Sequence, residues 1–374
     1  MRASNPLTSD RNNKPIQLIQ RLVLITMVVL SGCAGQQIKE VVVEDPVFYP
    51  SLPQSPRIQY LKTLSSLDDL TNEDNSFGDF LFDEEDQTDK SIIQKPYGVG
   101  FYDGAVFVVD TRGPGYVIFD LKNQKAHTIS GHGMQRPINI AFDEVGNRYI
   151  ADGAAGKILI FNSQNKFVRS FSTGDDFKPT DVLIKGDKIY VVETQNHRIQ
   201  ILAKNDGRKL TEFGKPGSKE GELYHPTNIK LDNKGNLYIV ETGNFRIQKF
   251  TENGQYISSF GKVGTGVGQM ARPKGIALDN KEIIYSVDSA FSVVQMFQPD
   301  GKLLLYFGGE GEEEGKLLLP ADIEISYDNL EIFQKYAHPD FVLEYVIAVT
   351  NQFGPNSVVL YGFGKMKGMD YINE

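Results

Sequence analysis

The segment Pro226–Gly261, PTNIKLDNKGNLYIVETGNFRIQKFTENGQYISSFG, decides the fold of this 374-residue chain. It contains four short runs, NIKLD, NLYIVET, RIQKFT and QYISSFG, which are rich in the β-branched and aromatic residues that favour strands. The separators NKG, GNF and ENG carry Gly or Asn, which tolerate the positive φ of tight hairpins. The segment is therefore predicted to form a four-stranded antiparallel meander, which cannot bury both of its faces alone.

Five further units of the same kind occur along the chain. Each opens with the pattern Pro-x-(Gly, Asn or Asp)-(Val or Ile), and the spacing of 41–47 residues is that of a four-stranded propeller blade. The sequence thus predicts an all-β fold, a six-bladed β-propeller of four-stranded antiparallel blades, over residues 93–365. The opening prolines are Pro96, Pro137, Pro179, Pro226, Pro273 and Pro320.

In five units the second predicted strand ends on a carboxylate. We expect these carboxylates to be architectural, bonded to turn amides and to an arginine of the next strand, as in Glu193/Arg198 and Glu241/Arg246. The sixth unit places Val349 or Thr350 there instead. The five carboxylates belong to Asp110, Asp152, Glu193, Glu241 and Asp288.

The sixth unit has only three predicted strands of its own. Residues 329–341 form an insertion between its first two strands, residues 357–365 form the third, and a tail follows over 366–374. Residues 57–65, which contain RIQYLKTL, resemble the fourth strands of other units. We expect this N-terminal strand to complete the last blade and close the ring, because closure removes exposed sheet edges.

The N-terminus resembles that of a bacterial lipoprotein. A basic segment precedes the apolar run LVLITMVVL, which is too short to span a bilayer, and Leu30-Ser31-Gly32-Cys33 is similar to a lipobox. This resemblance implies a signal peptide over 1–32 and lipidation at Cys33, the only cysteine. The alternative is an ordinary cysteine at the end of a signal peptide or anchor helix. The same resemblance implies that Ala34 after the cysteine, rather than Asp, favours outer-membrane sorting, so we expect a lipid-anchored protein of the cell envelope, periplasmic or surface-exposed.

Two segments are expected to link this anchor to the blades. Residues 33–56 contain four prolines, which favour an extended tether. Residues 66–92 form a linker with ten acidic residues, and no Lys or Arg occurs between Asp68 and Asp89. A short apolar segment interrupts this linker, either as a helical turn against the domain or as a partner-docking motif. It consists of Phe77, Phe80, Leu81 and Phe82.

The repeats themselves resemble NHL repeats. The resemblance is carried by FGKPGSKEGELYHPTNIKLDNKGNLYIVETGNFRIQKF and by ETQNHRIQ of the third unit, where Asn196, His197 and Arg198 stand in the family's positions. It covers about residues 91–365 and implies a six-bladed propeller. Proteins of this kind range from protein- and RNA-binding modules to bacterial sensor domains and a zinc-dependent amidating lyase. The resemblance therefore does not select one function.

The residues around the opening prolines are the candidates for ligand binding. The innermost strand of each propeller blade lines the central channel, so the second residues after the prolines are expected to form a ring at one mouth. Four ring positions carry side-chain oxygens, as calcium requires, although Asp and Asn at strand starts also satisfy backbone amides. These four residues are the calcium candidates, and no other cofactor is expected. They are Asn139, Asp181, Asn228 and Asp322.

Four flanking residues complete the predicted ligand-binding set: Tyr97, Tyr224, His225 and Lys274. A three-histidine zinc site is not expected, because of five histidines only His225 lies in register at a channel entrance. The net charge of −9 argues against nucleic acid as a partner. The chain also lacks GxSxG, HExxH, P-loop and CxxC motifs.

These observations favour a non-catalytic, envelope-anchored propeller. Its expected partner is a protein, peptide or carbohydrate held by the loop face and the channel mouth. The alternative is a metal-dependent (calcium or zinc) hydrolase or lyase with its site in the central channel.

Overall fold

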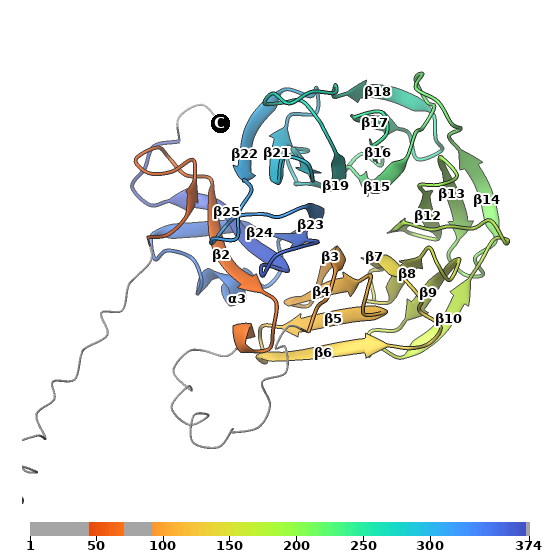
Figure 1. Ribbon diagram of the computed structural model, residues 1–374, viewed down its shortest axis with the longest axis horizontal. Coiled ribbons are helices and arrows are strands. Elements are labelled where there is room, and N and C mark those ends of the chain that lie inside the picture. The colour runs from red at the N-terminus through yellow and green to blue at the C-terminus, as the bar shows by residue number, and fades with distance from the viewer. Residues whose placement is uncertain (1–44, 71–91, 372–374) are drawn as a thin grey trace, which may run out of the picture. The chain divides into compact units, whose positions relative to one another are not determined.

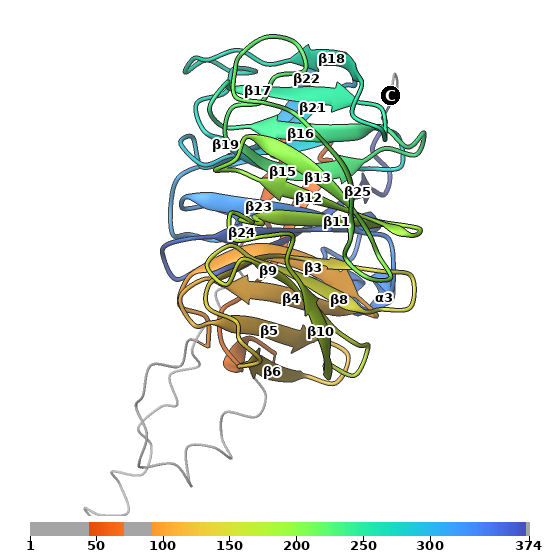
Figure 2. The ribbon, with the colours of Figure 1, turned by 90° about the vertical axis from the view of Figure 1, so that its right-hand side faces the viewer.

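Six antiparallel sheets surround a central channel in the computed structural model, which confirms the predicted six-bladed β-propeller (Figure 1). Figure 2 shows the ring from its side, where most strands run along the direction of the channel. The structure describes residues 45–70 and 92–371, and the propeller unit begins at Pro46. The leader with Cys33, the tether up to residue 44 and the linker residues 71–91 lie outside the described part.

The first three blades follow chain order from the channel outwards. Blade 1 contains β3 (Pro96–Tyr102), β4 (Ala105–Asp110), β5 (Gly115–Asp120) and β6 (Lys125–Ser130). Blade 2 contains β7 (Pro137–Phe142), β8 (Arg148–Asp152), β9 (Lys157–Phe161) and β10 (Phe167–Phe171). Blade 3 contains β11 (Asp181–Lys185), β12 (Lys188–Glu193), β13 (Arg198–Ala203) and β14 (Lys209–Phe213).

Blades 4 and 5 repeat this order, and blade 6 departs from it. Blade 4 contains β15 (Pro226–Leu231), β16 (Leu237–Glu241), β17 (Arg246–Phe250) and β18 (Tyr256–Phe260). Blade 5 contains β19 (Pro273–Leu278), β20 (Ile284–Asp288), β21 (Val293–Phe297) and β22 (Leu303–Gly308). Blade 6 contains β23 (Pro320–Ser326), β24 (Phe341–Asn351), β25 (Val358–Met366), β2 (Ile58–Leu64) and β1 (Phe48–Tyr49).

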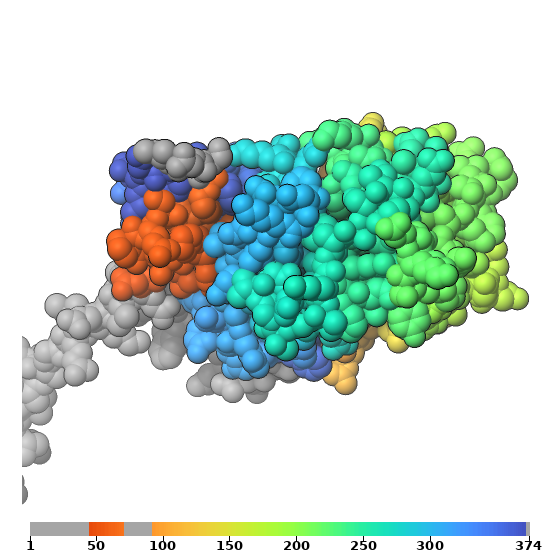
Figure 3. Space-filling view, turned by 90° about the horizontal axis from the view of Figure 1, so that it is seen from above, coloured from red at the N-terminus to blue at the C-terminus, as the bar shows by residue number. Residues whose placement is uncertain are grey.

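The N-terminal strand closes the ring as predicted. β2 pairs antiparallel with β25, with Ile58 opposite Phe363 and Leu64 opposite Val358. In the space-filling view the orange N-terminal segment lies directly against the blue C-terminal part of the chain (Figure 3). The sheet also extends one strand further than expected, because β1 lies within the segment assigned to the tether and pairs with β2.

Two short helical elements flank blade 6. The predicted insertion contains α3 (Leu330–Gln334), and a 3-10 turn, η1 (Asp68–Leu70), follows β2. No helix of the described residues is long and apolar enough to cross a membrane.

The sixth blade replaces the recurring carboxylate with Asn351, so the expectation of Val349 or Thr350 was wrong. Asn351 pairs with Pro320, just as Glu241 pairs with Pro226 in blade 4. Its Oδ1 accepts the Leu318 N–H at 3.1 Å, as a carboxylate oxygen does in other blades. The predicted position was wrong because β24 has 11 residues and ends later than the shorter strands used for comparison.

Six apolar layers, one between each pair of neighbouring blades, form the core. β2 contributes to two of them, since Ile58 packs between blades 5 and 6 whereas Leu61 and Leu64 pack between blades 6 and 1. Ile58 and Leu64 are completely buried. The closing strand therefore supplies both sheet hydrogen bonds and core volume.

We expect removal of residues 46–64 to abolish cooperative unfolding, because it opens the ring and exposes two apolar layers. The milder change Leu64→Ala is expected to lower the free energy of unfolding by about 2–5 kcal/mol. Urea unfolding followed by far-UV circular dichroism measures both. Removal of residues 1–44 is the control, and a 46–64 deletion that melts like this control would contradict the closure.

Candidate functional site

The strand-two carboxylates are bonded within the fold, as expected. Glu241 is completely buried and accepts the Tyr224 N–H at 2.8 Å, the Arg246 Nε–H at 2.6 Å and a Gln248 amide hydrogen at 2.7 Å. Glu193 makes the corresponding contact with Arg198 at 2.5 Å. These groups hold each blade's second strand to the turn beyond it and to the start of its first strand, so they are not free to bind a ligand.

The four ring residues lie buried inside the channel rather than open at its mouth. Asp181 accepts the N–H groups of Val182 and Ile229 at 2.8 and 2.9 Å, and Asn139 accepts the Ile140 N–H at 2.8 Å. These bonds are the backbone-satisfying arrangement that is common for Asp and Asn at strand starts.

The ring is also bridged across the channel. The Asn228 side-chain amide donates to Asp322 Oδ1 at 3.0 Å, and Asp322 Oδ2 accepts the Val99 N–H at 3.2 Å. The Asn228–Asp322 bond joins blade 4 to blade 6.

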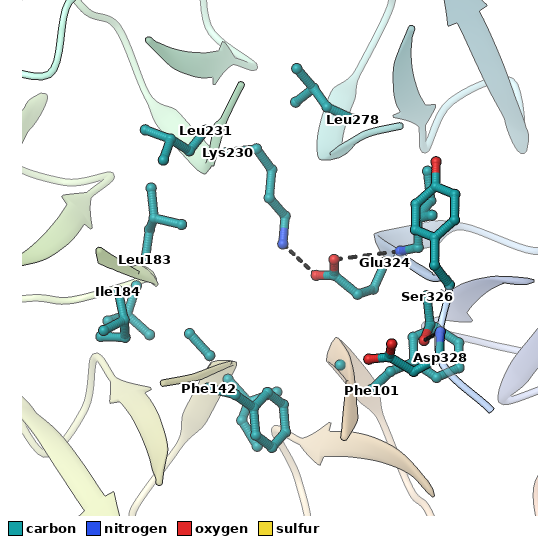
Figure 4. Close-up of a pocket in the computed structure, with 16 residues that line it drawn as sticks. Phe101, Phe142, Leu183, Ile184, Lys230, Leu231, Leu278, Glu324, Ser326 and Asp328 are labelled. Atoms are coloured by element: carbon teal, nitrogen blue, oxygen red, sulfur yellow. Dashed lines mark hydrogen bonds and ion pairs between the residues drawn. The ribbon is translucent and has the colours of Figure 1, made fainter. Parts of the chain in front are cut away.

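A second polar bridge lies one layer deeper and was not anticipated from the sequence. Lys230 reaches across the channel and pairs with Glu324 (Figure 4). Both residues line a cavity of about 440 Å³, in which Leu183, Ile184 and Leu278 form part of the wall. Lys230 and Glu324 stand two residues after Asn228 and Asp322, so the period-two alternation of a strand was the signal that would have identified them.

Burial and charge act together on the channel groups. Burial raises the pKa of Asp181 to about 6 and that of Asp322 to about 7, against the opposing attraction of Lys230. Burial lowers the pKa of Lys230, but Glu324, Asp322 and Asp181 outweigh it and hold the pKa above its ordinary value. Among the described residues, no group of three or more His, Cys, Asp or Glu side chains is arranged to hold a metal ion.

The end of the channel that carries the opening prolines, here called the proline mouth, holds a buried ammonium group. Lys274 is only 7% exposed, and its Nζ lies 5.2 Å from the centroid of the Tyr97 ring and 3.3 Å from Gln352 Oε1. Burial, followed by the charges of Arg272 and Lys95, lowers the pKa of Lys274 to about 8. The structure thus brings together two of the predicted binding residues, Tyr97 and Lys274.

The other two flanking residues form a separate aromatic cluster at the same mouth. Tyr224 stacks on His197 with ring centroids 4.9 Å apart, and His225 packs edge-on against both rings. The His225 N–H donates to His197 Nδ1 at 2.9 Å. Burial and the neighbouring His225 lower the pKa of His197, while Tyr224 remains 43% exposed.

A basic residue stands immediately before the opening proline in five of the six blades, and sequence analysis noted only one of them, His225. Because the innermost strands all begin at the same end of the channel, these positions all lie around the proline mouth. These residues could have been recognised from the aligned repeats, because each stands one position before the proline that opens the repeat pattern. The residues are Lys95, Arg136, Lys178, His225 and Arg272.

Comparisons with known proteins show the fold but no family. No protein-family model matches the chain. Protein brain tumor of Drosophila melanogaster is 31% identical over 87 residues, which are 22% of this chain and 8% of that protein.

Similar solved structures carry different descriptions. A structural genomics protein of unknown function from Bacteroides thetaiotaomicron matches with a TM-score of 0.56 and 14% identity, over 82% of this chain and 75% of its own. A gluconolactonase from Xanthomonas campestris matches with a TM-score of 0.52 and 14% identity, over 72% and 86%. At these identities the likeness extends to the propeller fold alone.

The two channel lysines are expected to respond oppositely to replacement by Met. The pKa of Lys274 is lower in the folded chain than its unfolded value of 10.5, so its charge opposes folding at pH 7 and stability rises as pH passes from about 8 to 10.5. Lys274→Met should therefore stabilise the protein by about 1–3 kcal/mol at pH 7 and remove this rise. Lys230→Met should destabilise it by about 1–3 kcal/mol, because the half-buried Glu324 and the buried Asp181 and Asp322 lose the cation that attracts them.

Urea unfolding of both variants at pH 7 and pH 9.5 tests this contrast. Equal losses of stability at pH 7 would show that the two ammonium groups do not differ as described.

Proposed function

We propose that the chain is an NHL-type propeller that acts as a non-catalytic binding module of the bacterial cell envelope. Its lipid anchor is attached at Cys33 and directs it to the outer membrane, and its partner is an envelope protein, peptide or carbohydrate held at the proline mouth. The lipobox-like leader supports the anchor. The similarity to protein brain tumor, an NHL-repeat protein, supports the repeat assignment.

The observation that carries this proposal is the difference between the channel interior and the proline mouth. In the interior, Asp181 and Asp322 accept backbone N–H groups and Lys230 pairs with Glu324, so the charged groups there have partners, although the Asn228 Oδ1 atom has none. The proline mouth instead presents an exposed stacked tyrosine, Tyr224, and a buried ammonium without a carboxylate partner in the described chain, Lys274. Such uncompensated groups are typical of surfaces that receive a partner.

No specific observation favours the hydrolase or lyase alternative. The channel carboxylates that would hold a metal ion already bond to backbone amides, to Asn228 or to Lys230. The gluconolactonase likeness concerns the fold, and its activity is a property of that protein.

A photo-crosslinking residue at position 224 is expected to capture an envelope component in intact cells. The same residue at position 327 is the matched control, because Tyr327 is similarly exposed but lines the cavity at the opposite end of the channel. Immunoblotting for mass-shifted adducts measures capture. Equal or absent capture at the two positions would argue against binding at the proline mouth.

The anchor is tested separately by Cys33→Ser, which removes the thiol that would receive the lipid. We expect this variant to leave the membrane fraction and to lose labelling by radioactive fatty acid. A variant that stays in the membrane fraction without label would show that another segment attaches the protein.

A further inference from the structure

A cleft of about 960 Å³ opens at the proline mouth between blades 1 and 6. It lies between the turns next to β3 and the turn that joins β24 to β25. Three cationic residues line it, namely Lys95, Arg112 and Arg136, and none of its described lining residues is acidic. We call this feature the cationic cleft.

No described carboxylate pairs with the cations of the cationic cleft. Within residues 45–70 and 92–371, none of the three cations forms an ion pair, whereas lysines elsewhere do, as in Lys204 with Asp143 and Lys249 with Asp232. A chain with a net charge of −9 thus gathers, in one place, three cations that form no ion pair with a described residue. Charge of one sign focused in a cleft favours a ligand of the opposite sign.

The buried Lys274 is a second indication that the cationic cleft binds an anion. It donates to Gln352, which lines the cationic cleft, and its pKa is lowered in part by the nearby charge of Lys95. Retaining an ammonium group that is 93% buried, with no carboxylate beside it in the described chain, costs stability that a bound anion would restore.

The remaining lining distinguishes among anionic ligands. Phe353 is 52% exposed, and Lys95 Nζ lies 5.3 Å from its ring centroid. Most of the other lining groups are Ser, Thr, Asn and Gln, and the lining aliphatic residue Ile93 is only 4% exposed. A peptide bound through its backbone or apolar side chains needs an open strand edge or apolar pockets, and a nucleic acid strand needs successive aromatic platforms. A single aromatic face among cations, amides and hydroxyls suits a charged sugar better than it suits such a peptide or a nucleic acid strand.

We propose that the cationic cleft binds an acidic oligosaccharide, with its anionic groups at Lys95 and Arg136 and a sugar ring against Phe353. This inference rests on the proposed binding function and names the class of partner.

Titration calorimetry of the purified full-length protein with tetragalacturonate, and with its neutral methyl ester, tests the proposal. We expect binding of the acid only, weakened at least tenfold in K95Q/R136Q and weakened in F353A. The control K122Q/K125Q removes the same charge from the turn between β5 and β6, at the opposite end of the same blade, and should bind like the unchanged protein. Thermal melting of every variant without sugar confirms that each one is folded.

Tetragalacturonate binding that is absent, or equal in both double variants, overturns the proposal. Binding of a polyglutamate peptide, an RNA oligonucleotide or phosphatidylglycerol vesicles that depends on Lys95 and Arg136, without tetragalacturonate binding, also overturns it and assigns the cleft to that class. Photo-crosslinking at position 224 distinguishes failure of the sugar-binding proposal from failure of the proposed binding function. Retained capture without sugar binding leaves the proposed function standing, whereas loss of both removes it as well.

Discussion

Ring closure by β2 is the constraint on which the rest of this structure depends. A propeller blade buries its faces only against two neighbours, so the layer between blades 6 and 1 exists only if the ends of the chain meet. β2 joins them by pairing with β25 and by placing Ile58 and Leu64 in two different apolar layers. The channel, its two polar bridges and the clefts at its ends all inherit their geometry from that closed ring.

Two polar contacts between side chains span the channel. The Asn228–Asp322 bond and the Lys230–Glu324 pair both join blade 4 to blade 6, two residues apart along each strand. Placing these groups inside the ring costs solvation, and the pairing offsets that cost only because both partners are fixed on strands. Among the described residues, the charged groups of the interior therefore have partners, whereas Lys95, Arg136 and Lys274 at the proline mouth form no ion pair.

The fold was predictable because its evidence is repeated. The opening prolines and the strand-two carboxylates recur in register, and each repeat gave an independent check on the blade boundaries. The site was less predictable because it depends on contacts between different blades. Nothing in the spacing shows that Lys230 meets Glu324 from two blades away, or that Lys274 is buried beneath Tyr97. The basic residues before the prolines, such as Lys95 and Arg136, could be recognised from the repeat, but only the three-dimensional structure shows that they pair with no carboxylate among the described residues.

The order of the strands in blade 6 also determines which strand a pulling force on the N-terminal segment reaches first. β1, joined to β2 by only two residue pairs, is the outermost strand, and β2 is the next one inwards. A pull on the chain ahead of Pro46 is therefore applied first to β1 and then to the closing strand, before any other blade. If the proposed lipid anchor holds the chain at a membrane, a pulling force would separate β2 from β25 before it reaches any other blade, and the ring would open at this pairing first.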